Sequence, residues 1–249
     1  MPIVVKSKEE ISLMREAGRA VAQVLEIMKG EIRPGLVVKK LDDIVRREFG
    51  RRGVTPTFLG YHGYPARVCV SVNDEVVHGI PNSRTLQEGD IVSIDLGATY
   101  KGFVGDAAIT VCVGQVSSEA ERLVRITEEA LWEGIRAARA GARLGEVSAA
   151  VQAHAEQNGF SVVREYVGHG IGREMHEEPQ VPNFGRPEQG PLLQEGMVLA
   201  IEPMVTAGDW RTKRDPDNWT VRTLDGSLAA HFEHTVAITD GEAEVLTLL

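Results

Sequence analysis

The 249-residue sequence has few cysteines, no block of basic residues and no long apolar run. Cys69 and Cys112 are too few for a disulfide framework and neither lies in a CxxC motif, which favours a reducing compartment. No apolar run approaches the roughly 20 residues that a bilayer crossing needs, so we expect a cytoplasmic protein without a targeting segment. The net charge of -9 is dispersed along the chain, which argues against nucleic acid or an anionic membrane as the partner.

The residues that are present predict a mixture of helices and strands. A helix is expected over residues 7–30, where Ser7 and Glu10 form a capping box, and a second one follows from Val38 to about residue 50. A further capping box, from Ser118 to Glu121, predicts a third helix, and a fourth, shorter helix follows a glycine break. Strands are expected at residues 68–72, 91–96, 103–113, 197–205, near 221 and 231–239.

The chain also contains an internal repeat. LQEGDIVSID at residues 86–95 recurs as LQEGMVLAIE at residues 193–202, which aligns Asp95 with Glu202. GDAAITVCVG at 105–114 resembles FEHTVAITDG at 232–241, which aligns Asp106 with Glu233. The distance along the chain between the two copies exceeds the length of a solenoid unit, which is roughly 20 to 50 residues. We therefore predict one catalytic domain of two similar α+β halves, residues 1–114 and 115–249, related by a pseudo-twofold axis.

Such an axis would bring four carboxylates together, those of Asp95, Asp106, Glu202 and Glu233. A lone Asp at a strand end is more often a turn or cap residue, and it is the repeat that favours a site here. Four like charges stay ionised in a low-dielectric site only with cations present, which indicates divalent metal and two bridged ions. His169, between glycines in YVGHGIG, would shift the preference toward Mn, Fe, Co or Zn. Two ions roughly 3.5 to 4 Å apart are suited to hydrolysis.

Histidines and aromatic residues gather in loops outside the helical pattern. His78 and His176 lie in VVHGIP and MHEEP, where each could be a ligand, bind substrate or stabilise a tetrahedral intermediate. The spacing of His169 and His176 is not the HExxH of a helical zinc protease, so it names no metal. The loop FLGYHGYP, with Trp219, could line an apolar pocket, and ordinary loop packing is the alternative.

In order and spacing, these motifs resemble those of the type I methionine aminopeptidases. The matching segments are GYHGYP, VNDEVVHGIP, IDLGATYKGFVGD, YVGHGIGREMHEEP, AIEPM and FEHT, and they cover nearly the whole chain. The resemblance implies the pita-bread fold shared with creatinase and proline-directed peptidases, an α+β fold with two halves around a central antiparallel sheet. It also implies removal of the N-terminal methionine from nascent proteins and peptides when the second residue is small.

The resemblance further implies roles for individual residues. The implied ligands of two divalent ions (Co, Fe, Mn or Zn) are Asp95, Asp106, His169, Glu202 and Glu233, with Asp106 and Glu233 bridging both ions. The implied catalytic residues are His78, His176 and Glu202, with Glu202 passing a proton to the leaving amine. The implied substrate-binding residues are Tyr61, Tyr64, Cys69, His78, His176 and Trp219. A monovalent cation site is implied near Ala229, which replaces a serine of relatives. Met175 and Phe58 depart from common residues, which changes the expected pocket shape.

Two other functions fit the same pattern of ligands. A proline-directed aminopeptidase or prolidase would use the same five residues, but those relatives usually carry a large N-terminal domain. A metal-free binding protein of this fold would have lost ligands, whereas all five positions are filled. We expect a monomer that acts on nascent polypeptide N-termini. The insertion at residues 206–219 could approach the ribosome or be a solvated loop.

Overall fold

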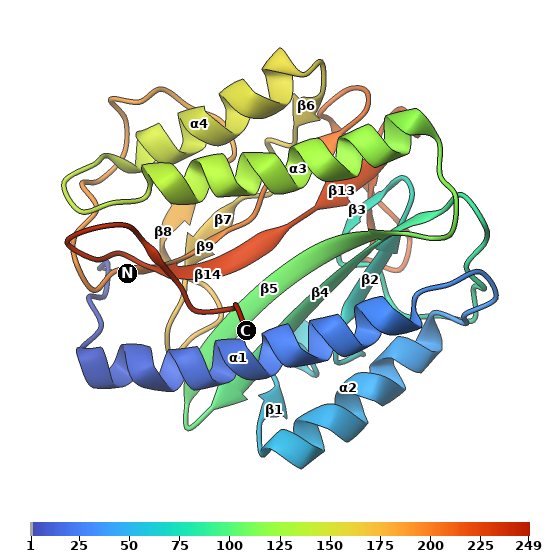
Figure 1. Cartoon of the computed structure of the whole chain (residues 1–249), viewed down its shortest axis with the longest axis horizontal. Helices are drawn as coiled ribbons and strands as arrows, with labels where there is room; N and C mark the ends of the chain where they lie inside the picture. The colour runs from blue at the N-terminus through green and yellow to red at the C-terminus, as the bar shows by residue number, and fades with distance from the viewer. Residues whose placement is uncertain (1) are drawn as a thin grey trace.

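An antiparallel sheet of nine strands lies at the centre of the computed structural model, which describes residues 2–249 (Figure 1). The main order is β1-β4-β5-β14-β9-β7-β8, with β2 beside β4 and β15 beside β14. The strands are β1 (Thr55–Pro56), β2 (Cys69–Val72), β4 (Ile91–Tyr100), β5 (Phe103–Cys112), β7 (Gly168–Gly170), β8 (Glu177–Val181), β9 (Val198–Ile201), β14 (Glu233–Ala237) and β15 (Glu244–Val245).

Helices cover one face of this sheet in two pairs. α1 (Lys8–Glu31) and α2 (Lys39–Arg52) lie along one half, and α3 (Ser118–Ala137) and α4 (Leu144–Gln157) along the other (Figure 1). The predicted capping box at Ser7 is confirmed, because its hydroxyl accepts from the Glu10 amide and the Glu10 carboxylate accepts from the Ser7 amide. The predicted box at Ser118 is wrong. Ser118 is already helical, and Ser117 is the residue whose hydroxyl accepts from the Ala120 amide.

The predicted strands at 197–205 and 231–239 are each divided in two. The first becomes β9 and β10 (Met204–Thr206), because Pro203 has no amide hydrogen with which to continue a ladder. The second becomes β13 (Ala229–His231) and β14. β10 and β13 leave the central sheet and form a smaller one, β13-β10-β6, with β6 (Ser161–Val162). Glu202 and Glu233 therefore lie where the chain passes between the two sheets.

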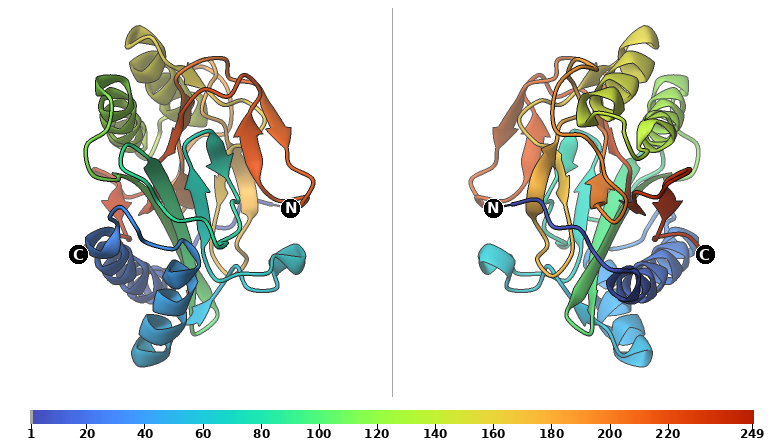
Figure 2. Two further views of the ribbon diagram at one scale, coloured as in Figure 1. Left: turned by 90° about the vertical axis from the view of Figure 1, so that its right-hand side faces the viewer. Right: turned by 90° about the vertical axis from the view of Figure 1, so that its left-hand side faces the viewer.

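A third sheet lies across the central sheet from the helices (Figure 2). Its order is β11-β12-β3, and its strands are β3 (Glu75–Val77), β11 (Thr212–Arg214) and β12 (Val221–Thr223). β11 falls within the insertion at 206–219 and forms a hairpin with β12. A 3-10 turn, Tyr61–Gly63, lies on the same side and belongs to the aromatic loop.

The helices are fixed to the sheet by apolar contacts and by one close backbone approach. Val21 and Leu41 pack in a core cluster with Leu96, and Leu131 and Leu199 belong to the corresponding cluster of the other half. Burial of each such side chain contributes about 1.5 to 3 kcal/mol.

In the middle of α1, Gly18 meets Gly105 of β5, where a Cβ on Gly105 would lie 2.5 Å from the Gly18 nitrogen. The helices thus pack against β4, β5, β9 and β14, and the expected α+β fold class is confirmed. The pairs β4–β5 and β9–β14 meet at the β5–β14 contact, the order that two related halves would give.

Candidate metal centre and substrate pocket

Strand register places the acidic residues on one face of the sheet. Ala108 of β5 pairs with Asp95 on one side and with Glu233 on the other, so these three side chains point the same way. Asp106 is two residues from Ala108 in the same strand and shares its face. On the far side of β14, Ala200 of β9 pairs with His169 of β7.

The alternation of side chains along β9 and β14 puts His169 on that face as well. Glu202 follows β9 directly. The structure thus brings together the five residues that the sequence predicted as ligands, from five different segments of the chain.

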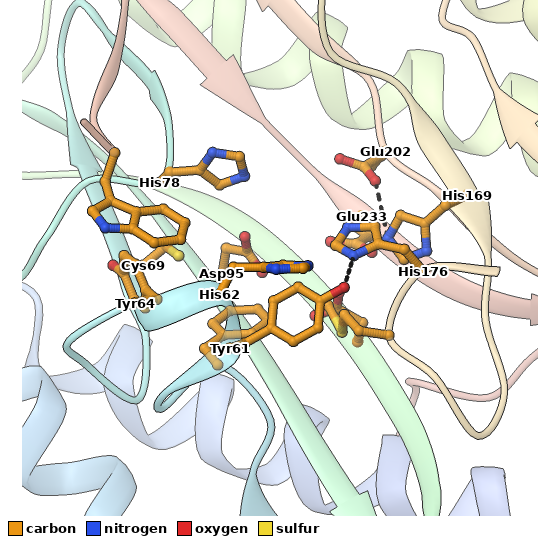
Figure 3. Close-up of a pocket in the computed structure, with 14 residues that line it drawn as sticks. Tyr61, His62, Tyr64, Cys69, His78, Asp95, His169, His176, Glu202 and Glu233 are labelled. Carbon is orange, nitrogen blue, oxygen red and sulfur yellow. Dashed lines mark hydrogen bonds and ion pairs between the residues drawn. The ribbon is translucent and has the colours of Figure 1, made fainter. Parts of the chain in front are cut away.

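These residues form one wall of a cavity of about 220 Å³ (Figure 3). Every residue predicted to bind metal or substrate lines it, together with Phe58 and His62 of the aromatic loop and Met175. The lining residues are Phe58, Tyr61, His62, Tyr64, Cys69, His78, Asp95, Asp106, His169, Met175, His176, Glu202, Trp219 and Glu233. In Figure 3 Glu202, Glu233 and His169 lie on one side, Tyr64, Cys69 and His78 lie on the other, and Asp95 lies between them.

The donor atoms of the acidic wall are close enough to share metal ions. One ligand atom from each of Asp106, His169 and Glu233 lies within 4.8 Å of the others. Nε2 of His169 is 3.4 Å from Oε1 of Glu202. Among the described residues, buried oxygens of Asp95, Asp106 and Glu233 have no hydrogen-bond partner. Unpaired buried acceptors of this kind are costly unless a cation meets them, so the residues fit divalent metal.

Burial shifts the pKa values of the residues in this cluster. Burial raises the pKa of the Asp106 carboxyl to about 7 and raises the pKa values of Asp95, Glu202 and Glu233 above their ordinary range. Repulsion between neighbouring carboxylates adds to the increase for the last three. Burial also lowers the pKa of His169 to about 3, which keeps its imidazole in the neutral form that coordinates metal.

His231 is a neighbour of this cluster that the sequence analysis missed. It ends β13, is 1% exposed, and its Nε2 lies 3.6 Å from Oε2 of Glu202 with no hydrogen-bond partner among the described residues. It can also supply a ligand atom within 4.8 Å of Glu202 and Glu233. Burial lowers the pKa of His231 to about 3. In the sequence, the signal for His231 was its position two residues before Glu233. The break between β13 and β14 meant that strand alternation did not predict the direction of its side chain.

The opposite wall is apolar and firmly built. The Tyr64 hydroxyl, directed into the protein, donates toward the carbonyl oxygens of Val68 and Gly79 at 3.1 and 2.8 Å. The Trp219 ring meets that of Tyr64 edge to face, with centroids 5.0 Å apart. Burial raises the pKa of Cys69, so this wall presents a neutral thiol. The aromatic loop therefore lines the cavity, and an unbranched apolar side chain is well matched by aromatic and sulfur surroundings.

Two histidines face the space between these walls. Nδ1 of His176 lies 2.7 Å from the Tyr61 hydroxyl, and the His176 ring is 4.3 Å from that of His169 between centroids. His78 takes a left-handed backbone conformation with φ of 61° and meets the Tyr166 ring edge to face. Burial and the neighbouring His176 lower the pKa of His78 to about 4, so it is neutral at pH 7.

A helix-covered antiparallel sheet that carries carboxylates and histidine at the floor of a cavity defines a pita-bread metalloenzyme. The sequence model of the metallopeptidase family M24 matches residues 12–240, and the chain belongs to this family. The predicted family is thereby confirmed.

Similar proteins share the full length of the chain. The methionine aminopeptidase of Clostridium perfringens is 52% identical over 99% of both chains, and methionine aminopeptidase 1 of Bacillus subtilis is 51% identical over 98% of this chain and 99% of its own. A crystal structure of methionine aminopeptidase from Thermotoga maritima superposes with a TM-score of 0.98 at 48% identity, covering 100% of both chains.

A prolidase from Pyrococcus furiosus shares the fold at a TM-score of 0.80, with 24% identity, and this chain covers 66% of its length. Within residues 2–249, no helix has both the length and the apolar character that a membrane crossing needs.

Proposed function

We propose that the chain removes the N-terminal methionine from peptides and nascent proteins when the second residue is small. The observation that carries this proposal is the joining of two unlike walls in one cavity, an apolar one at Tyr64, Cys69 and Trp219 and an acidic one at the sheet. The first wall suits a methionine side chain, and the second suits a free amine and metal ions. Similarity to methionine aminopeptidases over the whole chain supports the same substrate.

Asp95, Asp106, His169, Glu202 and Glu233 would together hold two divalent ions. The unpaired oxygens and the raised carboxyl pKa values support this arrangement. Bound ions would activate a water molecule and polarise the carbonyl of the first peptide bond. Mixed carboxylate and imidazole ligands suit Co, Fe, Mn or Zn.

The protein's own groups would bind the peptide and move protons. The apolar wall would take the methionine side chain and so place the first peptide bond over the carboxylates. The Glu202 carboxylate would take a proton from the attacking water and give it to the leaving amine. Nε2 of His176 would donate to the carbonyl oxygen as its charge grows, while Nδ1 is held by Tyr61. Neutral His78 would contact the peptide from the other side.

The remaining predictions concern the surroundings of the site. We propose that one catalytic domain is made of two related halves, 1–114 and 115–249, which the order β4-β5-β14-β9 supports. The cluster of carboxylates and His169 at the cavity floor leaves little room beside it, which favours a small second residue in the substrate peptide.

The β11–β12 hairpin exposes Lys213 and Arg214, and we propose that it approaches the ribosome in the cytoplasm, where nascent N-termini emerge. A monomeric state and a monovalent cation near Ala229 stay predictions.

The test is metal analysis of protein purified without added metal, paired with hydrolysis of Met-Ala, Met-Lys and Xaa-Pro peptides. We expect divalent metal to copurify and Met-Ala alone to be cleaved efficiently. Efficient cleavage of Xaa-Pro peptides would favour the proline-directed alternative, and full function after chelation would favour a binding protein. For the proton-transfer role, a Glu202→Gln variant that holds its metals and keeps full turnover would show that the assignment is wrong.

A further inference from the structure

A buried ion pair lies directly beneath the turn that carries His176. Nζ of Lys6 is 2.7 Å from Oε2 of Glu177, and the two side chains are 3% and 11% exposed. Lys6 lies in the segment before α1, whereas Glu177 follows His176 immediately and begins β8. A buried ammonium is costly unless it is paired, so this contact has to be well made.

The second oxygen of Glu177 holds the turn itself. Oε1 accepts from the backbone amides of Arg173 and Glu174, at 2.8 and 3.2 Å. A Cβ on Gly172 would lie 2.5 Å from Cε of Lys6 and 2.6 Å from Oε1 of Glu177, so the ion pair fills the space against the backbone. One carboxylate therefore joins the Lys6 ammonium to the turn that presents His176.

Lys6 is in turn fixed to the sheet side of the molecule. Its amide donates to the Gly196 carbonyl at 2.7 Å, and its ammonium also donates to the Val4 carbonyl at 3.2 Å. On the outer side of the turn, Arg173 reaches Glu10 of α1 at 3.2 Å. The turn is thus held from within by a buried contact and from without by an exposed one.

We propose that Lys6 is a positioning residue for His176 and acts through Glu177, an inference that rests on the proposed function of His176. Tyr64, Cys69 and Trp219 of the apolar wall come from other segments, so loss of Lys6 leaves these three residues in place. A misplacement of about 1 Å at a reacting group can cost roughly 10²-fold in rate. We expect Lys6→Met to lower kcat by at least about 10-fold and by no more than the roughly 10²-fold of such a misplacement. The KM should change by less than about 3-fold.

The test compares Lys6→Met with Val24→Ala, a core change in α1 away from the turn, at temperatures where both are fully folded and with metal content matched. Lys6→Met should lose kcat and Val24→Ala should keep it, while Lys6→Arg, which retains the charge, should recover part of the loss. Equal kcat in Lys6→Met and the unchanged protein would overturn the inference, as would equal losses in the Lys6→Met and Val24→Ala variants.

His176→Ala separates this inference from the proposed function. If His176→Ala is inactive and Lys6→Met is fully active, the role of His176 stands and that of Lys6 falls. If His176→Ala keeps full activity, the proposed role of His176 is itself wrong.

Discussion

The Tyr61 hydroxyl lies 2.7 Å from Nδ1 of His176, and the two rings stack with centroids 5.4 Å apart (Figure 3). A hydroxyl that donates to Nδ1 leaves the proton of the neutral imidazole on Nε2. That nitrogen is then a donor for the carbonyl oxygen of a bound peptide. The contact joins the 3-10 turn of the aromatic loop to the turn before β8, two segments that are far apart in the chain.

Replacing Tyr61 with Phe should lower turnover more than it weakens binding. The change keeps the stacked ring and removes the hydroxyl, so the imidazole can adopt the other tautomer or turn away. We expect kcat to fall by about 10-fold, less than the roughly 10²- to 10⁴-fold that a positioned acid or base itself contributes, with KM little changed. Steady-state kinetics on a Met-Ala peptide measure both constants.

Tyr64→Phe is the matched control for that change. The Tyr64 hydroxyl bonds to two backbone carbonyls behind the pocket, so its loss should cost about 1 kcal/mol of stability and affect KM ahead of kcat. If Tyr61→Phe turned over at the full rate, the hydrogen bond to His176 would have no catalytic consequence.

Gly105→Ala should destabilise the fold strongly. The added Cβ would lie 2.5 Å from the Gly18 nitrogen and 2.8 Å from its Cα, and backbone cannot give way as a side chain can. Overpacking of this kind costs about 1 to 3 kcal/mol or more. Gly30→Ala is the control, because nothing lies within 4 Å of its added Cβ and alanine favours the helix by roughly 0.5 to 1 kcal/mol. Denaturant unfolding of both variants should give changes of opposite sign.

Most of the site could be predicted because the repeat in the sequence marks equivalent strand positions. Asp95 and Glu202 align in one phrase and Asp106 and Glu233 in another, and strand periodicity then fixes their shared face. Periodicity does not report where a strand changes sheets. The breaks at Pro203 and between β13 and β14 were therefore not predicted, and neither was the position of His231 beside the carboxylates.

Sequence periodicity likewise does not predict contacts between segments that are distant in the sequence. The pairing of Lys6 with Glu177 and of Tyr61 with His176 depends on how loops fold back on the sheet. Local pattern was more informative at helix ends, where Ser7 was assigned correctly. It failed by one residue at α3, because Ser117 and Ser118 are both acceptable caps and only the backbone conformation separates them.

Trp219→Ala should raise KM for methionine peptides with little change in kcat. Its ring closes the apolar wall against Tyr64, and burial of an aromatic side chain against a ligand contributes about 1.5 kcal/mol or more. We expect KM to rise by about 10-fold, the ratio that this energy represents. Trp210→Ala is the control, because that ring belongs to the same insertion and packs with Arg164 and Arg211 instead. Equal effects of the two changes would place Trp219 outside the methionine pocket.

Removal of metal should destabilise the protein, and the size of that effect should depend on pH. The folded-state pKa of Asp106 is raised to about 7, above its ordinary value of 3.8, and the pKa values of Asp95, Glu202 and Glu233 are also raised. Between pH 3.8 and about 7, the Asp106 carboxyl of the metal-free folded state therefore binds more protons than that of the unfolded state. The stability that Asp106 contributes is therefore fully present below its ordinary pKa of 3.8 and is lost as pH rises through about 7. The three other carboxyls act in the same direction.

Metal ions compete with those protons, so the gain in Tm on adding metal to the stripped protein should be larger at pH 8 than at pH 6. Calorimetric titration at the two pH values should show proton release on metal binding and weaker affinity at pH 6. Asp106→Asn removes one of the competing groups and should reduce both the Tm gain and the proton release. A Tm gain that is the same at both pH values, with no protons released, would mean that the carboxylates are not the groups that meet the metal.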